Sequence, residues 1–220
     1  FLNFDNPRIE KKFICDNRSV KQTVNIIKTI KPYFVNTYPK RIINNIYFDN
    51  IDRNSYFENI EGISERFKIR IRWYNQLFDK ITNPKLKIKF KKNNVSFKNS
   101  INIKEFDFNK KIKNKKLNQW IKDESNKFFF LKLLKSYEIS SINTYCREYF
   151  ASIDKKVRMT VDYNIKFYNK NLIKFHSYSI PRNYIVIELK YNLDQIKSGS
   201  YISNKIPYKI TKHSKYVEGI

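Results

Sequence analysis

The stretch FKIRIRW, from Phe67 to Trp73, decides the fold because apolar and cationic side chains alternate along it without a break. Successive side chains of a β-strand point to opposite faces, so the stretch predicts a strand with one cationic and one apolar face. Lys68, Arg70 and Arg72 make the cationic face. The same alternation recurs in three further segments, whose charged or polar faces consist of Lys85, Lys87, Lys89 and Lys91; of Arg158, Thr160 and Asp162; and of Glu188 and Lys190.

Cationic faces of this kind are unfavourable in an ordinary sheet, because like charges directly opposite each other in an antiparallel pair cost a few tenths to ~1 kcal/mol each. The cost is offset where the faces converge on an anionic ligand. Eight or more strands with short connections also favour a closed antiparallel sheet. We therefore expect an α+β fold, a closed eight-stranded antiparallel β tunnel with its charges inside and helices packed on its apolar outer face. An ordinary sandwich with a basic exterior is the alternative, and periodicity alone does not separate the two.

The rest of the chain divides into short elements without a long linker, which predicts a single domain over residues 1–220. A loop is expected over residues 104–118. Helices are expected after the capping-box signal of Ser19 and Gln22, over residues 52–60 with Gly62 as the C-terminal cap, and over residues 117–136. The expected strands are residues 8–15, 41–48, 65–74, 84–91, 95–103, 142–150, 155–168, 172–176 and 184–191.

The charge balance indicates a polyanionic partner, since 45 Lys and Arg against 20 Asp and Glu give a net charge of +25. A genome rich in A and T would raise the lysine content by itself, so the placement of arginine carries more weight. RNA-binding motifs such as RNP1 are absent and the aromatic residues fall mostly on apolar faces, so no nucleic-acid partner is expected. No apolar stretch approaches the ~20 residues of a membrane span. The two cysteines, Cys15 and Cys146, fit a reduced, cytoplasmic setting.

The cations of these faces are candidate phosphate ligands, because Arg binds two phosphate oxygens with its planar fork and Lys supplies a point charge. They are Lys12, Arg66, Lys68, Arg70, Arg72, Lys89, Lys98, Arg147, Arg158, Lys190 and Lys215. The acids among them are Glu10, Asp162 and Glu188. Each acid either neutralises neighbouring cations or holds Mg²⁺ or Mn²⁺ together with phosphate oxygens. No nucleophile motif is evident in the sequence, and phosphoryl transfer requires none from the protein.

Several short motifs occur in order along the chain: RIEKKF (Arg8–Phe13), INNIYFDN (Ile43–Asn50), ERFKIRIRWY (Glu65–Tyr74), KLKIKFK (Lys85–Lys91), VSFK (Val95–Lys98), YCREYF (Tyr145–Phe150), VRMTVD (Val157–Asp162), IELK (Ile187–Lys190) and SKY (Ser214–Tyr216). Taken in this order, they resemble the motifs of the polyphosphate polymerase (VTC) domain family, which belongs to the CYTH/triphosphate tunnel metalloenzyme superfamily. The resemblance implies a transferase whose basic tunnel holds ATP and inorganic polyphosphate. It implies metal-dependent transfer of the terminal phosphoryl group of ATP to a growing polyphosphate chain.

The resemblance also implies roles for individual residues. Glu188 would bind Mn²⁺ or Mg²⁺, with Asp162 and Glu10 as weaker candidate ligands. The expected catalytic residues are Arg70, Arg72, Lys89, Arg158 and Glu188. The expected phosphate-binding residues are Lys12, Lys98, Arg147, Lys190 and Lys215, and the strand pattern adds Lys68.

Two departures from the superfamily pattern bear on the activity. Arg8 stands where hydrolases and cyclases tend to carry the first acid of an ExExK motif, which removes a metal ligand and argues against a hydrolase. Lys87-Ile88-Lys89 stands where relatives often carry Glu-x-Lys, which adds a cation. A triphosphate or polyphosphate hydrolase on the same scaffold and a non-catalytic polyphosphate-binding module are the alternative functions.

Overall fold

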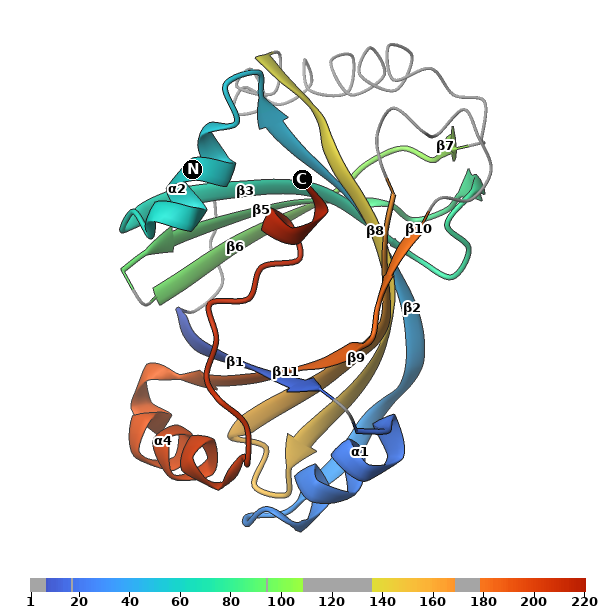
Figure 1. The fold of residues 1–220 in the computed structure, drawn as a ribbon. Coiled ribbons are helices and arrows are strands. Elements are labelled where there is room, and N and C mark those ends of the chain that lie inside the picture. Colours follow the sequence, from blue (N-terminus) through green and yellow to red (C-terminus); the bar gives the residue numbers. More distant parts are fainter. Residues whose placement is uncertain (1–6, 17, 94, 109–135, 169–178) are drawn as a thin grey trace.

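Eight strands close into a hydrogen-bonded ring, as the alternation predicts (Figure 1). The computed structural model describes residues 7–16, 18–93, 95–108, 136–168 and 179–220. The ring strands are β1 (Arg8–Asp16), β2 (Phe34–Asn50), β3 (Glu65–Tyr74), β5 (Lys85–Lys92), β6 (Val95–Asn102), β8 (Tyr137–Ser152), β9 (Val157–Tyr168) and β11 (Tyr184–Asn192). Their order is β9-β11-β1-β6-β5-β3-β2-β8, and β8 pairs back onto β9. All of these pairings are antiparallel.

Three short strands lie beside the ring. β10 (Ser179–Arg182) extends the sheet by pairing with β9. β4 (Asp79–Ile81) and β7 (Phe106–Phe108) form a separate two-stranded sheet. The expectation of a loop over residues 104–118 is therefore wrong for β7. The helix expected over 117–136, apart from its last residue, and the strand expected over 172–176 lie outside the described residues.

Three α-helices are present in the described part of the chain: α1 (Val20–Thr29), α2 (Asn54–Glu61) and α4 (Ile196–Lys205). The capping box predicted for α1 is confirmed, because Ser19 Oγ accepts from the Gln22 backbone amide and the Gln22 side chain accepts from the Ser19 amide. Gly62 ends α2 with φ +78°, the left-handed conformation that glycine adopts without a Cβ clash. The sequence did not predict α4.

The apolar strand faces point outward and are covered from outside, so the ring is inverted relative to an ordinary small barrel. One core cluster joins α1 and α4 to the lower strands in Figure 1, with Ile27 and Ile202 packed among Phe13, Met159 and Leu189. A second cluster lies under β4 and β7, where the ring of Trp73 contacts Phe106 and Phe108 edge-on at centroid distances of 6.2 and 5.7 Å. The sandwich alternative is thereby excluded.

Contacts between strands that are not neighbours show that the charged faces point into the ring. Lys89 on β5 bonds Glu10 on β1, although β6 lies between these strands. Arg147 on β8 reaches Glu188 on β11 across β9 in the same way. Side chains of next-but-one strands meet only if they project toward the shared interior. The ring therefore has an apolar outer layer and an interior that is mostly charged, with a smaller apolar cluster around Ile43, Tyr145 and Val186.

The C-terminal tail, residues 206–220, crosses one end of the ring after α4 (Figure 1). Ile210 forms an isolated β-bridge with Phe13, and the Thr211 amide donates to the Lys12 carbonyl at 2.8 Å. Farther along, a short 3-10 helix, η4 (Val217–Gly219), follows Tyr216, whose hydroxyl donates to Asp49. We call this end of the ring the tail end and the other the opposite end.

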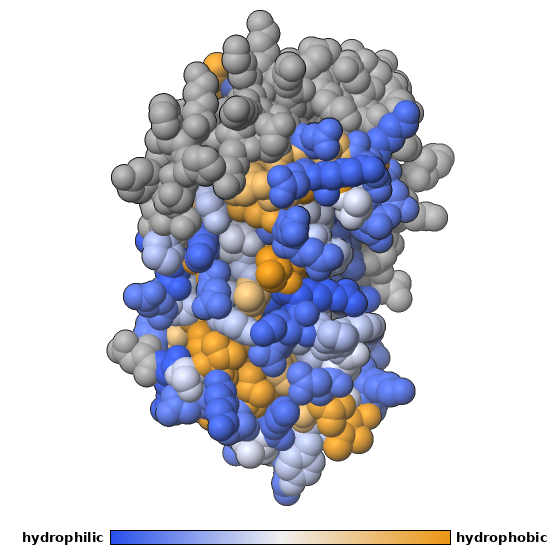
Figure 2. Space-filling model, turned by 90° about the vertical axis from the view of Figure 1, so that its right-hand side faces the viewer, coloured by the Kyte–Doolittle hydropathy of each residue, from blue (hydrophilic) through white to orange (hydrophobic). Residues whose placement is uncertain are grey.

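The outer surface is mostly hydrophilic on the face that carries β2 and β8, with hydrophobic residues in separate patches (Figure 2). None of the helices in the described ranges is long and apolar enough to span a membrane.

Candidate functional site

The structure brings most of the expected site residues into one interior. Lys12, Lys68, Arg70, Arg72, Lys89, Arg147, Lys190 and Lys215, with Glu10 and Glu188, are all buried or half-buried there. Lys98 and Arg158 are exposed, yet each lies directly across a strand pair from an interior lysine, Lys98 from Lys89 and Arg158 from Lys190. These two residues therefore flank the interior.

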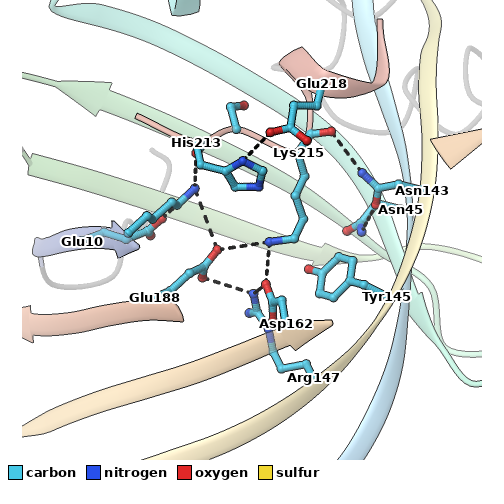
Figure 3. Close-up of polar contacts among 12 residues, drawn as sticks. Glu10, Asn45, Asn143, Tyr145, Arg147, Asp162, Glu188, His213, Lys215 and Glu218 are labelled. Atoms are coloured by element: carbon cyan, nitrogen blue, oxygen red, sulfur yellow. Dashed lines mark hydrogen bonds and ion pairs between the residues drawn. The ribbon is translucent and has the colours of Figure 1, made fainter. Parts of the chain in front are cut away.

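Asp162, Glu188 and Arg147 form the charged centre of the interior (Figure 3). Arg147 Nε and Nη2 donate to the two carboxylate oxygens of Asp162 at 2.5 and 2.6 Å, and Nη2 also donates to Glu188 Oε2 at 3.1 Å. Lys215 Nζ from the tail donates to Asp162 Oδ2 at 2.5 Å, and Lys190 Nζ to Glu188 Oε2 at 2.6 Å. Burial alone would raise the pKa of Glu188, but Lys190, Arg147, Lys12 and Lys215 outweigh it and hold that pKa well below its usual value.

The repeated Glu-x-Lys pattern places opposite charges side by side on β1 and β11. The antiparallel register sets Glu10 opposite Lys190 and Lys12 opposite Glu188. Glu10 also contacts Lys89 at 3.0 Å and Lys12 at 3.4 Å. Burial would raise the pKa of Glu10, but Lys89, Lys190 and Lys12 hold it well below the usual value. This alternation relieves the like-charge repulsion that the sequence pattern creates.

The arginines of β3 have neutral partners instead. Arg70 Nη1 donates to the Tyr47 hydroxyl at 3.1 Å. Arg72 donates to Asn45 Oδ1 and to the Tyr145 hydroxyl, both at 2.8 Å. Such partners hold a guanidinium in place without cancelling its charge, so this side of the interior keeps an excess of positive charge.

The neutral residues of the site were not predicted from the sequence. Asn45, Tyr47 and Tyr145 position the arginines, and Asn143 accepts from Asn45 Nδ2 at 2.8 Å. Asn45 and Tyr47 are two residues apart on β2, and Asn143 and Tyr145 are two residues apart on β8. This spacing, which puts each pair on one strand face, was the signal that could have identified them. Ser214 lies in one of the short family motifs without an expected role, and its hydroxyl accepts from Lys68 Nζ at 2.7 Å.

Lys87 was not among the expected site residues either, although it lies on the cationic face of β5. Burial, followed by Arg72, Arg70, Lys98 and Lys85, lowers its pKa to about 7. Lys68 and Lys89 also have lowered pKa values, chiefly through burial. These amines therefore lose their protons more readily than surface lysines do.

We expect polyphosphate affinity to fall as the pH rises above about 7, because a bound polyanion raises the pKa of Lys87 and the complex keeps its proton. Below that pH the amine is already charged, so affinity levels off. One such group changes affinity by at most about tenfold per pH unit. Lys87→Arg should make the affinity fall less steeply with pH, since a guanidinium stays charged. Lys68 and Lys89 account for the pH dependence that remains in this variant.

The measurement is a polyphosphate titration at pH values from about 6 to about 9. Lys80→Arg is the matched control, because Lys80 lies on β4 outside the ring. Identical slopes for the wild type and Lys87→Arg would show that Lys87 does not contact the polyanion.

The interior carboxylates suit a metal ion only if phosphate oxygens supply the remaining ligands. Among the described residues, no three His, Cys, Asp or Glu side chains gather into a metal site. Glu188 Oε1, however, lies 3.8 and 3.7 Å from the ammonium groups of Lys12 and Lys215, beyond hydrogen-bond length. That oxygen has coordinating capacity left, whereas both Glu10 oxygens contact lysines. Mg²⁺ is commonly held by one or two carboxylates plus substrate phosphates, and Glu188 fits that arrangement.

Two solved structures show the same fold at low sequence identity. One is a protein from Hippeastrum, described as an adenylyl cyclase with a dominant triphosphatase activity, with a TM-score of 0.54, 12% identity and coverage of 98% of this chain and 95% of that chain. The other, from Vibrio parahaemolyticus, is described as an adenylate cyclase candidate, with a TM-score of 0.53, 10% identity and 97% of each chain covered. At these identities the likeness concerns the fold alone.

The sequence itself identifies the family. No curated protein sequence matches the chain. The VTC domain profile matches residues 7–220, which is nearly the whole chain and includes every strand of the ring and the tail. The inverted ring with its cationic interior agrees with that match, and the chain therefore belongs to the VTC domain family.

Proposed function

We propose that this protein transfers the terminal phosphoryl group of ATP to an inorganic polyphosphate chain held inside the ring. The observation that carries the proposal is the excess of buried cations on the inner face. Arg70 and Arg72 have neutral hydrogen-bond partners, so their charges are available to a polyanion. A solvated basic surface would not bury these groups among amides and tyrosines.

In the proposed reaction the protein positions the phosphates and stabilises negative charge. The attacking oxygen comes from the acceptor phosphate, so no nucleophilic side chain is required. Arg70 and Arg72 supply fixed donors to the phosphoryl oxygens, and Arg147 holds the Glu188 carboxylate in place. A divalent ion held by Glu188 would neutralise phosphate charge.

Hydrolysis of triphosphate is the second candidate, and the tail favours it. Polymer synthesis needs room for a lengthening chain, whereas the tail occupies one end of the ring through its contacts with Lys12, Lys68 and Asp49. A triphosphate needs only the opposite end. The triphosphatase activity described for the Hippeastrum protein agrees with this candidate.

One assay separates the candidates. The purified protein is incubated with ATP and either Mn²⁺ or Mg²⁺, and the phosphate products are resolved by size. Polyphosphate together with ADP supports the transferase, and free phosphate alone supports the hydrolase. Tight polyphosphate binding without turnover would leave a binding module.

Arg70→Ala should weaken polyphosphate binding and lower its salt dependence by about one counterion, because the variant neutralises one phosphate fewer. Arg72→Ala should do the same, but Arg72 also bonds Asn45 and Tyr145, so Arg70 is the cleaner test. Arg18→Ala is the control, because Arg18 is exposed next to α1 and stacks on Tyr208. Titrations at several salt concentrations give both quantities. Unchanged affinity and salt slope in Arg70→Ala would remove this residue from the site.

A further inference from the structure

The inner face changes character at the opposite end of the ring, where an arginine is surrounded by tyrosines. The Arg41 guanidinium carbon lies 5.3 Å from the Tyr38 ring centroid, 5.4 Å from that of Tyr74 and 5.6 Å from that of Tyr149. Tyr38 and Tyr149 also contact each other edge-on, with centroids 5.7 Å apart. We call Tyr38, Arg41, Tyr74 and Tyr149 the aromatic end.

The strand register makes the aromatic end a continuation of the charged interior. Arg41 lies directly opposite Arg147 on β8. Tyr149 follows Arg147 by two residues, and Tyr74 follows Arg72 by two residues, so each tyrosine shares a strand face with an interior arginine. Two residues along a strand span about 7 Å. The rings therefore lie one short step outside the arginines proposed to bind phosphate.

These rings do not suit a phosphate chain. The face of an aromatic ring carries negative potential, which repels phosphate oxygens. A nucleobase, in contrast, stacks on tyrosine faces and on guanidinium planes. Tyr38 is 57% exposed, so its ring is accessible to a ligand and is not simply core packing.

We infer that the aromatic end stacks the base of a nucleoside triphosphate whose phosphates extend inward to Arg72 and Arg70. This inference rests on the proposed function, because it takes the interior to be the phosphate site. It adds which residues bind the base of that donor, and that the donor enters at the end opposite the tail. The ribose would span the step between the tyrosines and the arginines.

The test compares ATP with inorganic tripolyphosphate, which offers the same phosphates without a base. Binding of each is measured by calorimetry in metal-free buffer containing EDTA, so that turnover plays no part. Tyr38→Ala should weaken ATP binding by about fivefold, the lower range for loss of one stacking partner, and leave tripolyphosphate binding unchanged. Tyr38→Phe should bind ATP as the wild type does, because it keeps the ring.

The outcomes separate this inference from the proposed function. Loss of ATP affinity alone in Tyr38→Ala, restored in Tyr38→Phe, supports a base-stacking site. If the wild type binds tripolyphosphate but Tyr38→Ala changes neither ligand or both equally, the inference is overturned and the phosphate site stands. If the wild type binds neither ligand, the proposed function and the inference both fail. Matching melting curves for the three proteins confirm that they are folded.

Discussion

Glu188→Gln is expected to lower turnover at least about 100-fold while polyphosphate binding is kept or becomes tighter. A metal ion at a phosphoryl group supplies several kcal/mol of charge stabilisation, and each 1.36 kcal/mol is a factor of ten in rate, so losing the proposed ligand has an effect of about this size. Binding should survive because Glu188 now neutralises Lys190 and Arg147, and a glutamine releases their charge to the ligand. Steady-state turnover and a separate polyphosphate titration measure the two effects.

The control for this variant is Glu105→Gln, which removes an exposed carboxylate paired with Lys80 outside the ring. It should leave turnover and binding unchanged. An equal loss of turnover and binding in Glu188→Gln would contradict the metal role and point to a structural one. A change in the metal concentration needed for half-maximal turnover would support it directly.

Arg147→Ala is expected to lower the free energy of unfolding by about 3–5 kcal/mol, the usual cost of leaving one partner of a buried ion pair without its charge. Arg147 is buried and makes three hydrogen bonds to Asp162 and Glu188. Its removal leaves both carboxylates in the interior with only lysine partners. Urea unfolding monitored by circular dichroism gives the change.

A second substitution separates charge imbalance from a loss of packing. Adding Asp162→Ala to Arg147→Ala should recover part of the stability, because the carboxylate that lost its guanidinium is then gone. Arg158→Ala on the neighbouring strand is the control and should lie within about 0.5 kcal/mol of the wild type, since Arg158 is exposed. A double variant less stable by the full sum of both losses would show that the charges are not coupled.

The sequence predicted the ring where alternation was unbroken. The bounds of β3 match the expected residues 65–74, and the charged face does point inward. The first half of β2 was missed, because Pro39 interrupts it and its pairing with β8 shifts register twice before Arg41. The helix α4 was missed because Gly199 disfavours helices in general. Here the glycine is required, since a Cβ at this position would overlap the ring of Tyr191.

The candidate site was predictable in its charges but not in its neutral partners. Buried cations that converge on one face leave a clear pattern, and the structure joins Arg147 to Glu188 by a hydrogen bond and places the half-buried Arg70 near enough for the charge of Arg147 to act on it. Asparagine and tyrosine occur in every kind of environment, so Asn45 and Tyr145 carried no comparable signal. Lys215 was an expected site residue, but the path of the tail across the ring was unpredictable for another reason. Its residues have no periodicity, and their role comes from long-range contacts that only the closed ring creates.

Because the tail lies across one end of the ring, it limits how a polymer passes through the interior. An interior open at both ends would let a processive enzyme release its product at one end while the nucleotide donor enters at the other. Ser214, Lys215 and Tyr216 contact the ring at the tail end, so under the proposed activity product and donor would both use the opposite end. Under the proposed activity each cycle would then end with release of the chain, and the products would be short and distributively made unless the tail swings away.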